Sequence, residues 1–179
     1  MNPVISQKDA FALDEFTITS NYASEAELMD NAGRNIAQFI VENIQNPFNQ
    51  KFVVIAGPGN NGGDAIICHY YLNHYGVSSE LLLFNKKQME SWIFKQYSIF
   101  NDTIEFFTNK YKLEPEKWYV DGIFGIGLKR NVEGIYKELI ESLSDYNQII
   151  SIDIPSGVYC DTGLIAGSNI YANFTLTMG

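Results

Sequence analysis

The sequence predicts an α/β fold: a doubly wound, mostly parallel sheet with helices on both faces, preceded by two leading helices. Short apolar runs alternate with helical patterns after residue 50, as in sheets covered on both sides. Polar, glycine-containing segments follow three of these runs, at positions typical of ligand-binding strand ends. The 179 residues suffice for one domain, expected to span residues 1–179. Together these features describe a Rossmann-like architecture.

The elements are expected in the following order. Ser6 with Asp9 marks the start of a first helix, and Ser24 with Glu27 forms a capping box that opens a second helix ending near residue 46. Strands are expected at the apolar runs 52–56, 80–84, 104–107, 118–124, 148–154 and 174–178. Helices are expected between them at 64–75, 92–100 and 135–143. A strand order of 3-2-1-4-5-6 would bring the first, fourth and fifth strands side by side.

Composition argues against several classes of protein. Acidic residues outnumber basic ones by 21 to 12, and a net charge of −9 disfavours binding to nucleic acid or anionic membranes. Two cysteines, Cys68 and Cys160, cannot form a disulfide framework. No apolar run approaches the length of a membrane helix, and no secretory signal opens the chain. A cytoplasmic location is therefore expected.

A glycine motif follows the first predicted strand. Gly57, Gly59 and Gly62 have the G-x-G-x-x-G spacing of dinucleotide-binding loops. That motif normally has an acidic residue at the end of the next strand, where it binds the ribose, but Phe84 and Asn85 stand there. An ordinary NAD-dependent dehydrogenase is thus disfavoured, whereas phosphate binding at the loop remains consistent with the sequence.

Three polar clusters are expected to meet at one rim of the sheet. They lie at 60–64, at Asp121 with 125–131, and at 153–157. The carboxyl ends of parallel strands share one edge, so residues distant in sequence come together there. Asp121 interrupts an apolar strand, and a buried carboxylate is costly unless it is paired, protonated or metal-bound. A purely structural role, capping backbone amides, is the alternative for Asp121.

The sequence of these clusters resembles a known family. The segments AGPGNNGGD (56–64), VDGIFGIGL (120–128) and DIPSG (153–157), with DTG (161–163) behind them and ELMDNAGR (27–34) before them, resemble the NAD(P)H-hydrate epimerase family. This is also called the YjeF N-terminal domain family. The resemblance implies an isomerase of nicotinamide cofactor repair, which interconverts the R and S forms of hydrated NADH and NADPH.

The resemblance also implies roles for individual residues. A potassium ion would be held by Asn61, Asp121 and Ser156. Substrate contacts would come from Asn60, Asn61, Gly62, Gly63 and Asp64, from Gly125, Ile126, Gly127, Leu128, Lys129, Arg130 and Asn131, and from Asp153. Asp121 is expected to act as the acid and base, with Asp153 as the second candidate for that role.

Partners and alternatives follow from the same resemblance. A separate dehydratase on another chain would act on the product, and a homodimer through the N-terminal helices is expected. Ala65 and the segment 129–131 depart from the family pattern, and the chain stops at Gly179, before the end of a usual family domain, as a truncated chain would. A catalytically silent nucleotide-binding or protein-interaction scaffold is the alternative, and a different reaction in the same crevice is a third hypothesis.

Overall fold

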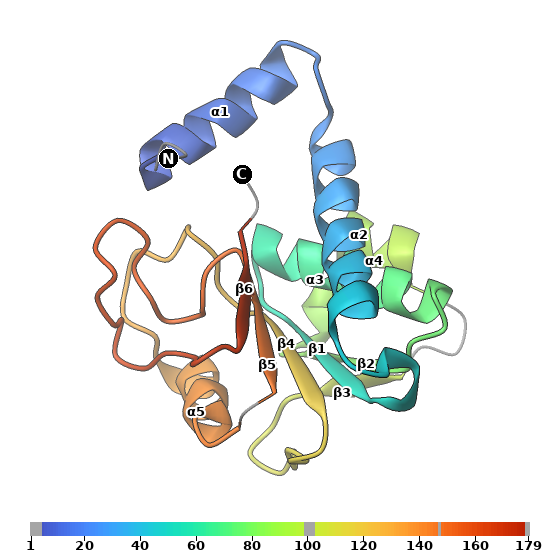
Figure 1. Ribbon diagram of the computed structural model, residues 1–179. Coiled ribbons are helices and arrows are strands. Elements are labelled where there is room, and N and C mark those ends of the chain that lie inside the picture. Colours follow the sequence, from blue (N-terminus) through green and yellow to red (C-terminus); the bar gives the residue numbers. More distant parts are fainter. Residues whose placement is uncertain (1–4, 99–102, 147, 178–179) are drawn as a thin grey trace.

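The computed structural model describes residues 5–98, 103–146 and 148–177. Within them the chain forms one parallel sheet of six strands in the order β3-β2-β1-β4-β5-β6, as predicted (Figure 1). The strands are β1 (Phe52–Ala56), β2 (Ser79–Leu83), β3 (Ile104–Phe106), β4 (Trp118–Gly122), β5 (Ile149–Ile152) and β6 (Phe174–Leu176). From β1 the strands follow one another to β3 in one direction across the sheet, and from β4 to β6 in the opposite direction. The topological switch point therefore lies between β1 and β4.

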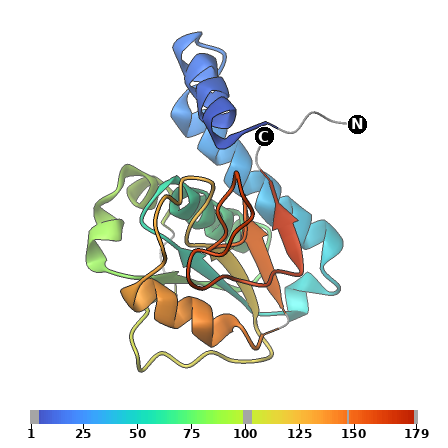
Figure 2. The ribbon, with the colours of Figure 1, turned by 90° about the vertical axis from the view of Figure 1, so that its left-hand side faces the viewer.

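Helices cover both faces of this sheet. The α-helices of the described residues are α1 (Gln7–Thr19), α2 (Glu25–Asn43), α3 (Asn60–His74), α4 (Trp92–Tyr97) and α5 (Gly134–Leu143), with short 3₁₀ helices η1 (Pro47–Asn49) and η2 (Lys86–Glu90). In Figures 1 and 2, α2, α3 and α4 lie on one side of the sheet and α5 lies on the other. The doubly wound architecture is confirmed.

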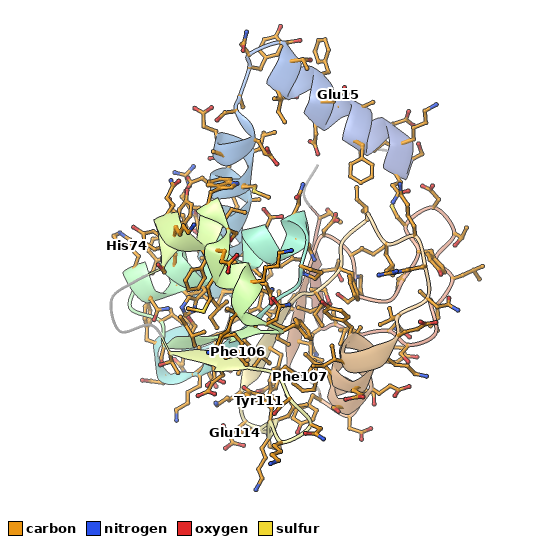
Figure 3. The ribbon with its side chains drawn as sticks, turned by 180° about the vertical axis from the view of Figure 1, so that it is seen from behind. Glu15, His74, Phe106, Phe107, Tyr111 and Glu114 are labelled. Carbon is orange, nitrogen blue, oxygen red and sulfur yellow. The ribbon has the colours of Figure 1, made fainter. Side chains whose placement is uncertain are left out.

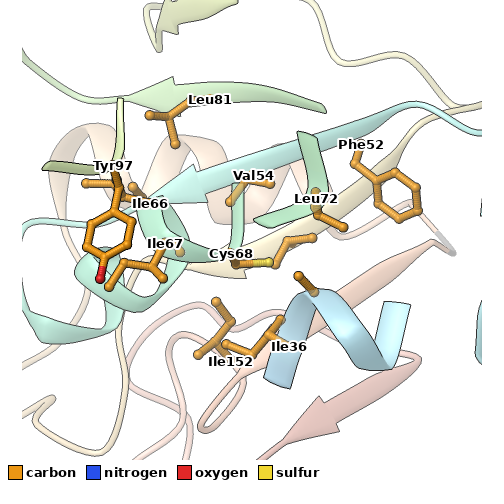
Figure 4. Close-up of a cluster of buried hydrophobic side chains, with 14 of the residues drawn as sticks. Ile36, Phe52, Val54, Ile66, Ile67, Cys68, Leu72, Leu81, Tyr97 and Ile152 are labelled. Carbon is orange, nitrogen blue, oxygen red and sulfur yellow. The ribbon is translucent and has the colours of Figure 1, made fainter. Parts of the chain in front are cut away.

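Two apolar layers hold the helices to the sheet. Alternate residues of β1 divide between them: Val54 faces α2 and α3, whereas Ile55 faces α5. Figure 4 shows Val54 with Cys68, Leu72 and Ile36, all fully buried. Burying one such aliphatic side chain contributes about 1.5–3 kcal/mol, so these layers fix the strand ends that carry the polar residues.

Several predicted boundaries were wrong. Helix α3 begins at Asn60 rather than at residue 64, because its N-cap is Gly59, which makes no side-chain capping bond. Strand β5 ends at Ile152 rather than at residue 154, since Asp153 has a positive φ of 66° that breaks the extended conformation. Strand β4 likewise ends at Gly122 rather than at residue 124. The predicted ends of the helix 92–100 and the strand 174–178 lie partly outside the described residues.

Helix α1 stands apart from the sheet. Both of its predicted capping partners are present, with the Ser6 side chain accepting from the backbone of Asp9. However, the helix has no buried residue, and its apolar stripe faces outward: Leu13 and Phe16 are 53% and 58% exposed. Figure 1 shows α1 reaching from the top of α2 over the loops that follow β4 and β5. Among the described helices, none is long and apolar enough to cross a membrane.

Candidate active site

The carboxyl ends of β1, β4 and β5 meet at one rim of the sheet. The register pairs Ile55 with Asp121 and Asp121 with Ser151, so the three predicted polar clusters are neighbours. Figure 3 shows this end of the molecule beneath α1, where Glu15 is labelled, while Tyr111 and Glu114 mark the opposite end. The convergence expected from the strand order is confirmed.

The turn between β1 and α3 depends on close backbone packing. A Cβ atom at Gly62 would lie 1.9 Å from the carbonyl oxygen of Gly57, and one at Gly57 would lie 1.9 Å from the carbonyl oxygen of Ile123. Only glycine avoids both collisions. The turn therefore directs the N-terminus of α3 at the rim, and the positive end of the helix dipole favours anions there.

A crevice of about 560 Å³ opens at this rim. Its size is typical of small-molecule sites. It is lined by the turn and first residues of α3, by the loop 123–130 after β4, by Asp153 after β5, and by Phe11 and Asp14 of α1. Lys129 and Arg130 are the basic side chains of this lining.

The crevice contains many of the residues that sequence analysis singled out. Those lining it are Asn60, Asn61, Asp64, Gly125, Ile126, Gly127, Leu128, Lys129, Arg130 and Asp153. Those absent from its lining are Gly62, Gly63, Asn131, Asp121 and Ser156. Lining residues that were not predicted as substrate contacts are Phe11, Asp14, Pro58, Gly59, Ile123 and Phe124. Of these, Pro58, Gly59, Ile123 and Phe124 lie within the recognised motifs, whereas α1 carries no sequence signal that places it here.

Asp121 lies beneath the crevice and is completely buried. Its Oδ1 accepts from the Ser156 hydroxyl at 2.6 Å and from the backbone N–H of Ile123 at 3.2 Å. Its Oδ2 accepts from the Ser151 hydroxyl at 2.8 Å and from the backbone N–H of Ser156 at 2.9 Å. Burial raises the pKa of Asp121, and these donated bonds oppose the rise. Asp121 thus ties β4 to β5 and to the loop after β5.

Ser156 extends this network to the crevice wall. Its Oγ accepts from the backbone N–H of Phe124 at 2.9 Å and lies 3.2 Å from the carbonyl oxygen of Phe124, to which it can donate. The loop 123–130 is therefore held in place by the same buried group as the loop that starts at Asp153.

Asp153 faces the crevice from the end of β5. Its left-handed backbone, with φ of 66°, is uncommon for a residue other than glycine, and such outliers cluster at functional sites. Its Oδ2 accepts from the backbone N–H of Ile126 at 2.7 Å. A Cβ atom at Gly125 would lie 2.5 Å from that oxygen, so the glycine makes room for the carboxyl group. Burial raises the pKa of Asp153, and the Ile126 bond opposes this.

Asp64, which also belongs to one of the predicted polar clusters, is a second carboxyl group that lines the crevice. Burial, followed by the charges of Asp153 and Asp14, raises its pKa to about 8. Like charges that share a site cannot all be ionised cheaply. A pKa of about 8 means that Asp64 is mostly protonated at neutral pH. Buried carboxyl groups with raised pKa values that line a crevice are typical of acid–base sites.

The donor set at the rim suits a cation that prefers oxygen. Asn61, Asp121 and Ser156 offer amide, carboxylate and hydroxyl oxygens, and hard cations prefer such ligands. The ion pairs seen within residues 5–98, 103–146 and 148–177 join Lys117 and Lys137 to glutamates, and none involves Asp121. If the Ser156 hydroxyl turned to the carbonyl oxygen of Phe124, Asp121 Oδ1 would keep only the hydrogen bond from the Ile123 N–H and could also contact an ion. Clusters of three or more His, Cys, Asp or Glu side chains that could hold a metal are absent from the described part of the chain.

Comparison with known proteins agrees with this architecture. A family model described as YjeF-related protein N-terminus matches residues 25–179. The chain is 31% identical over 178 residues to the NAD(P)H-hydrate epimerase of Oenococcus oeni, covering 97% of this chain and 84% of that protein. It is 32% identical over 167 residues to the NAD(P)H-hydrate epimerase of Entamoeba histolytica, covering 90% of this chain and 73% of that protein.

Longer relatives and a solved structure give the same picture. The bifunctional NAD(P)H-hydrate repair enzyme Nnr of Dictyoglomus turgidum is 35% identical over 160 residues, which cover 84% of this chain. The chain spans only 30% of the length of that relative. The crystal structure of yeast ynu0, YNL200c, superposes with a TM-score of 0.83 at 26% identity, covering 97% of this chain and 79% of that one.

Proposed function

We propose that this chain, which belongs to the family of the YjeF-related protein N-terminus, acts as an NAD(P)H-hydrate epimerase. Relatives matched over most of their length are named for that activity. The observation that carries the proposal is the crevice at the strand ends, which combines a helix N-terminus, two basic side chains and two carboxyl groups whose pKa values are raised by burial. The substrates would be hydrated NADH and NADPH.

The reaction requires one carbon of the nicotinamide ring to be inverted. That carbon carries a hydroxyl group and adjoins the ring nitrogen. If a carboxylic acid protonates the hydroxyl, water leaves while the nitrogen lone pair forms a C=N bond and the ring becomes cationic. Water then adds to the other face, and a carboxylate takes up the released proton. The protons balance, and the carboxyl groups stabilise the transient positive charge.

Asp153 and Asp64 are the carboxyl groups best placed for this chemistry, because both face the crevice. Asp64 carries a proton at neutral pH and can act as the acid. Asp153 can act as its partner. We assign Asp121 a positioning role instead of the acid–base role predicted from the sequence, since it is fully buried and four donors already occupy its oxygens.

The phosphates of the substrate would bind at the opening of α3. Asn60 and Asn61, its first residues, line the crevice, where the positive end of the helix dipole attracts anions. Lys129 and Arg130 add charge on the facing loop. The remaining predicted contacts, Gly62, Gly63 and Asn131, would shape this region through the backbone, since they are not part of the crevice lining.

The proposal includes a potassium ion held by Asn61, Asp121 and Ser156. These residues fit it through their oxygen donors and through the buried Asp121 carboxylate, whose charge a cation would balance. Such an ion, when bound, would supply positive charge that keeps Asp121 ionised and the rim rigid. The amide of Asn61 already donates from Nδ2 to the carbonyl oxygen of Ile152 at 3.4 Å, which presents its oxygen to another partner.

The further partners of the chain are also proposals. A dehydratase on another chain would consume the product, as the name of the bifunctional relatives suggests for those proteins. Exposed apolar side chains, Leu13 of α1 and Tyr22 beyond its end, favour a homodimer through this helix, which sedimentation equilibrium would detect. The cytoplasmic location stays a prediction that cell fractionation would test.

An epimer-interconversion assay tests the function. Hydrated NADH enriched in the R form is incubated with the protein, and both epimers are followed by chromatography. Spontaneous interconversion is subtracted. We expect acceleration by the wild type and a loss of turnover of about 10²–10⁴-fold in Asp153→Asn, the usual contribution of a general acid or base. A wild type that binds hydrated NADH without accelerating interconversion would instead support the catalytically silent scaffold.

A further inference from the structure

We infer that helix α1 belongs to the substrate site, and that the Phe11 ring packs against a planar group of the bound dinucleotide. This inference rests on the proposed function, because it takes hydrated NADH as the ligand. It concerns a part of the chain that precedes residue 25, where the family match begins. The match to the family model therefore assigns these residues no role.

One face of α1 is turned toward the crevice. Gln7, Phe11 and Asp14 are spaced i, i+4 and i+7, so they lie along a single stripe of the helix. Phe11 and Asp14 line the crevice. The backbone N–H of Gln7 donates to Asp161 Oδ1 at 2.8 Å, and its Nε2 donates to the carbonyl oxygen of Ile126. These bonds attach the start of the helix to the two loops that border the site.

Phe11 lies over the glycine loop of the crevice. Its Cζ is 3.9 Å from the position that a Cβ atom would take at Gly127. The ring is nevertheless 44% exposed, so a large part of it remains accessible to a ligand. The exposed part of an aromatic ring in the wall of a small-molecule crevice can serve as a stacking platform for a planar group.

Asp14, on the same stripe as Phe11, lines the crevice together with Asp64 and Asp153. Burial is the main cause of the raised pKa of both carboxyl groups, and the charge of Asp14 adds to it. A ring packed against the exposed part of Phe11 would therefore lie in the crevice that these carboxyl groups line. The hydrated nicotinamide is the ring that must reach them, and its planar part is the C=C bond with its carboxamide, because the carbon that carries the hydroxyl group is saturated.

The weak attachment of α1 supports a role for the ligand in its docking. The helix has no buried residue, and Figures 1 and 2 show it joined to the body through the segment before α2 while it spans the loops at the rim. A ligand packed against Phe11 would contact both α1 and the loops at the rim of the sheet. The helix and the substrate would then stabilise each other's position.

The test compares two phenylalanines of the same helix. Phe11→Ala removes the ring at the crevice, and Phe16→Ala removes an exposed ring that is not part of its lining. Dissociation constants for hydrated NADH are measured by calorimetry, and KM and kcat by the epimer assay. Stacking of a whole base on an aromatic side chain contributes about 1–3 kcal/mol. The planar part of the hydrated nicotinamide is smaller than a base, so the lower end applies, and Phe11→Ala should weaken binding and raise KM by about 5-fold.

The accompanying variants make the result specific. Phe16→Ala should bind as the wild type does, and Phe11→Tyr should restore affinity because it keeps the ring. Wild-type affinity in Phe11→Ala, or an equal loss in Phe16→Ala, would overturn the inference. A wild type that binds hydrated NADH but does not epimerise it would refute the proposed function alone, because the dissociation constants of the wild type and Phe11→Ala would still test the contact with Phe11. A wild type that does not bind hydrated NADH would refute both.

Discussion

Substituting Asp121 by asparagine should destabilise the fold, although the two side chains have the same shape. Each carboxylate oxygen of Asp121 accepts one backbone N–H, from Ile123 on Oδ1 and from Ser156 on Oδ2. An asparagine amide has one oxygen and one NH₂ group. Whichever way it is turned, one of the two backbone N–H groups therefore faces another donor.

The size of the effect follows from this stranded donor. Leaving a buried N–H without an acceptor costs about 1–3 kcal/mol. Hydroxyl donors can rotate away, so Ser151 and Ser156 add less. The remaining bonds weaken because they lose charge assistance, but removing a fully buried charge relieves its desolvation, and these two changes offset each other. We expect the free energy of unfolding to fall by about 1–3 kcal/mol.

Urea unfolding at pH 7, followed by circular dichroism, measures this loss for Asp121→Asn against Asp153→Asn. Asp153 accepts a hydrogen bond from the Ile126 N–H through Oδ2 alone, which an asparagine carbonyl can preserve. Asp153→Asn should therefore change stability by less than about 1 kcal/mol. Equal unfolding midpoints for the wild type and Asp121→Asn, at an unchanged denaturant slope, would refute the role of Asp121 as a buried acceptor of backbone hydrogen bonds.

Three further outcomes are expected. The pKa of Asp64 is raised from 3.8 to about 8, so the protonated carboxyl group contributes stability that is fully present below pH ~4. This contribution should be lost as the pH rises to about 8, by at most about 1.4 kcal/mol per pH unit. Urea unfolding at several pH values should show a weaker dependence of stability on pH in Asp64→Asn, and an unchanged pH dependence would contradict the raised pKa. Gly125→Ala should lower the melting temperature and slow turnover, because the added Cβ atom would lie 2.5 Å from Asp153 Oδ2. Gly127→Ala is the control and should keep the wild-type melting temperature, because its Cβ atom would meet only the Phe11 ring, at 3.9 Å. Replacing potassium by a bulky organic cation should weaken binding of hydrated NADH, and equal affinity in both salts would argue against the ion.

The fold was predictable because its signals are local. Uninterrupted apolar runs mark buried parallel strands, and Ser6 and Ser24 mark helix starts through capping geometry that the structure reproduces. The start of α3 escaped prediction because Gly59 caps it without a side-chain bond. The end of β5 escaped it because the left-handed backbone of Asp153 depends on its surroundings rather than on its own propensity.

The site was predictable only as a set of neighbours. Strand order and register bring Asn61, Asp121 and Asp153 to one rim, but sequence does not show which carboxyl group is open to solvent. Asp121 is closed off by Ser151 and Ser156, which lie 30 and 35 residues further along the chain. Of its donors, only the N–H of Ile123 lies within the motif around Asp121. The donors from Ser151 and Ser156 are set by tertiary packing.

Helix α1 shows why motif analysis underestimates a binding site. The motifs identify loops at strand ends, where the chain itself must turn, and these form the floor and sides of the crevice. A segment that closes the crevice from outside needs no special turn and no buried core, so Phe11 and Asp14 leave only an ordinary amphipathic helix pattern. Their contribution depends on the contacts of Gln7 with Asp161 and Ile126, which join residues more than 100 positions apart. Because α1 contributes no buried residue to the core, substitutions at Phe11 and Asp14 should change substrate affinity with little effect on the stability of the fold.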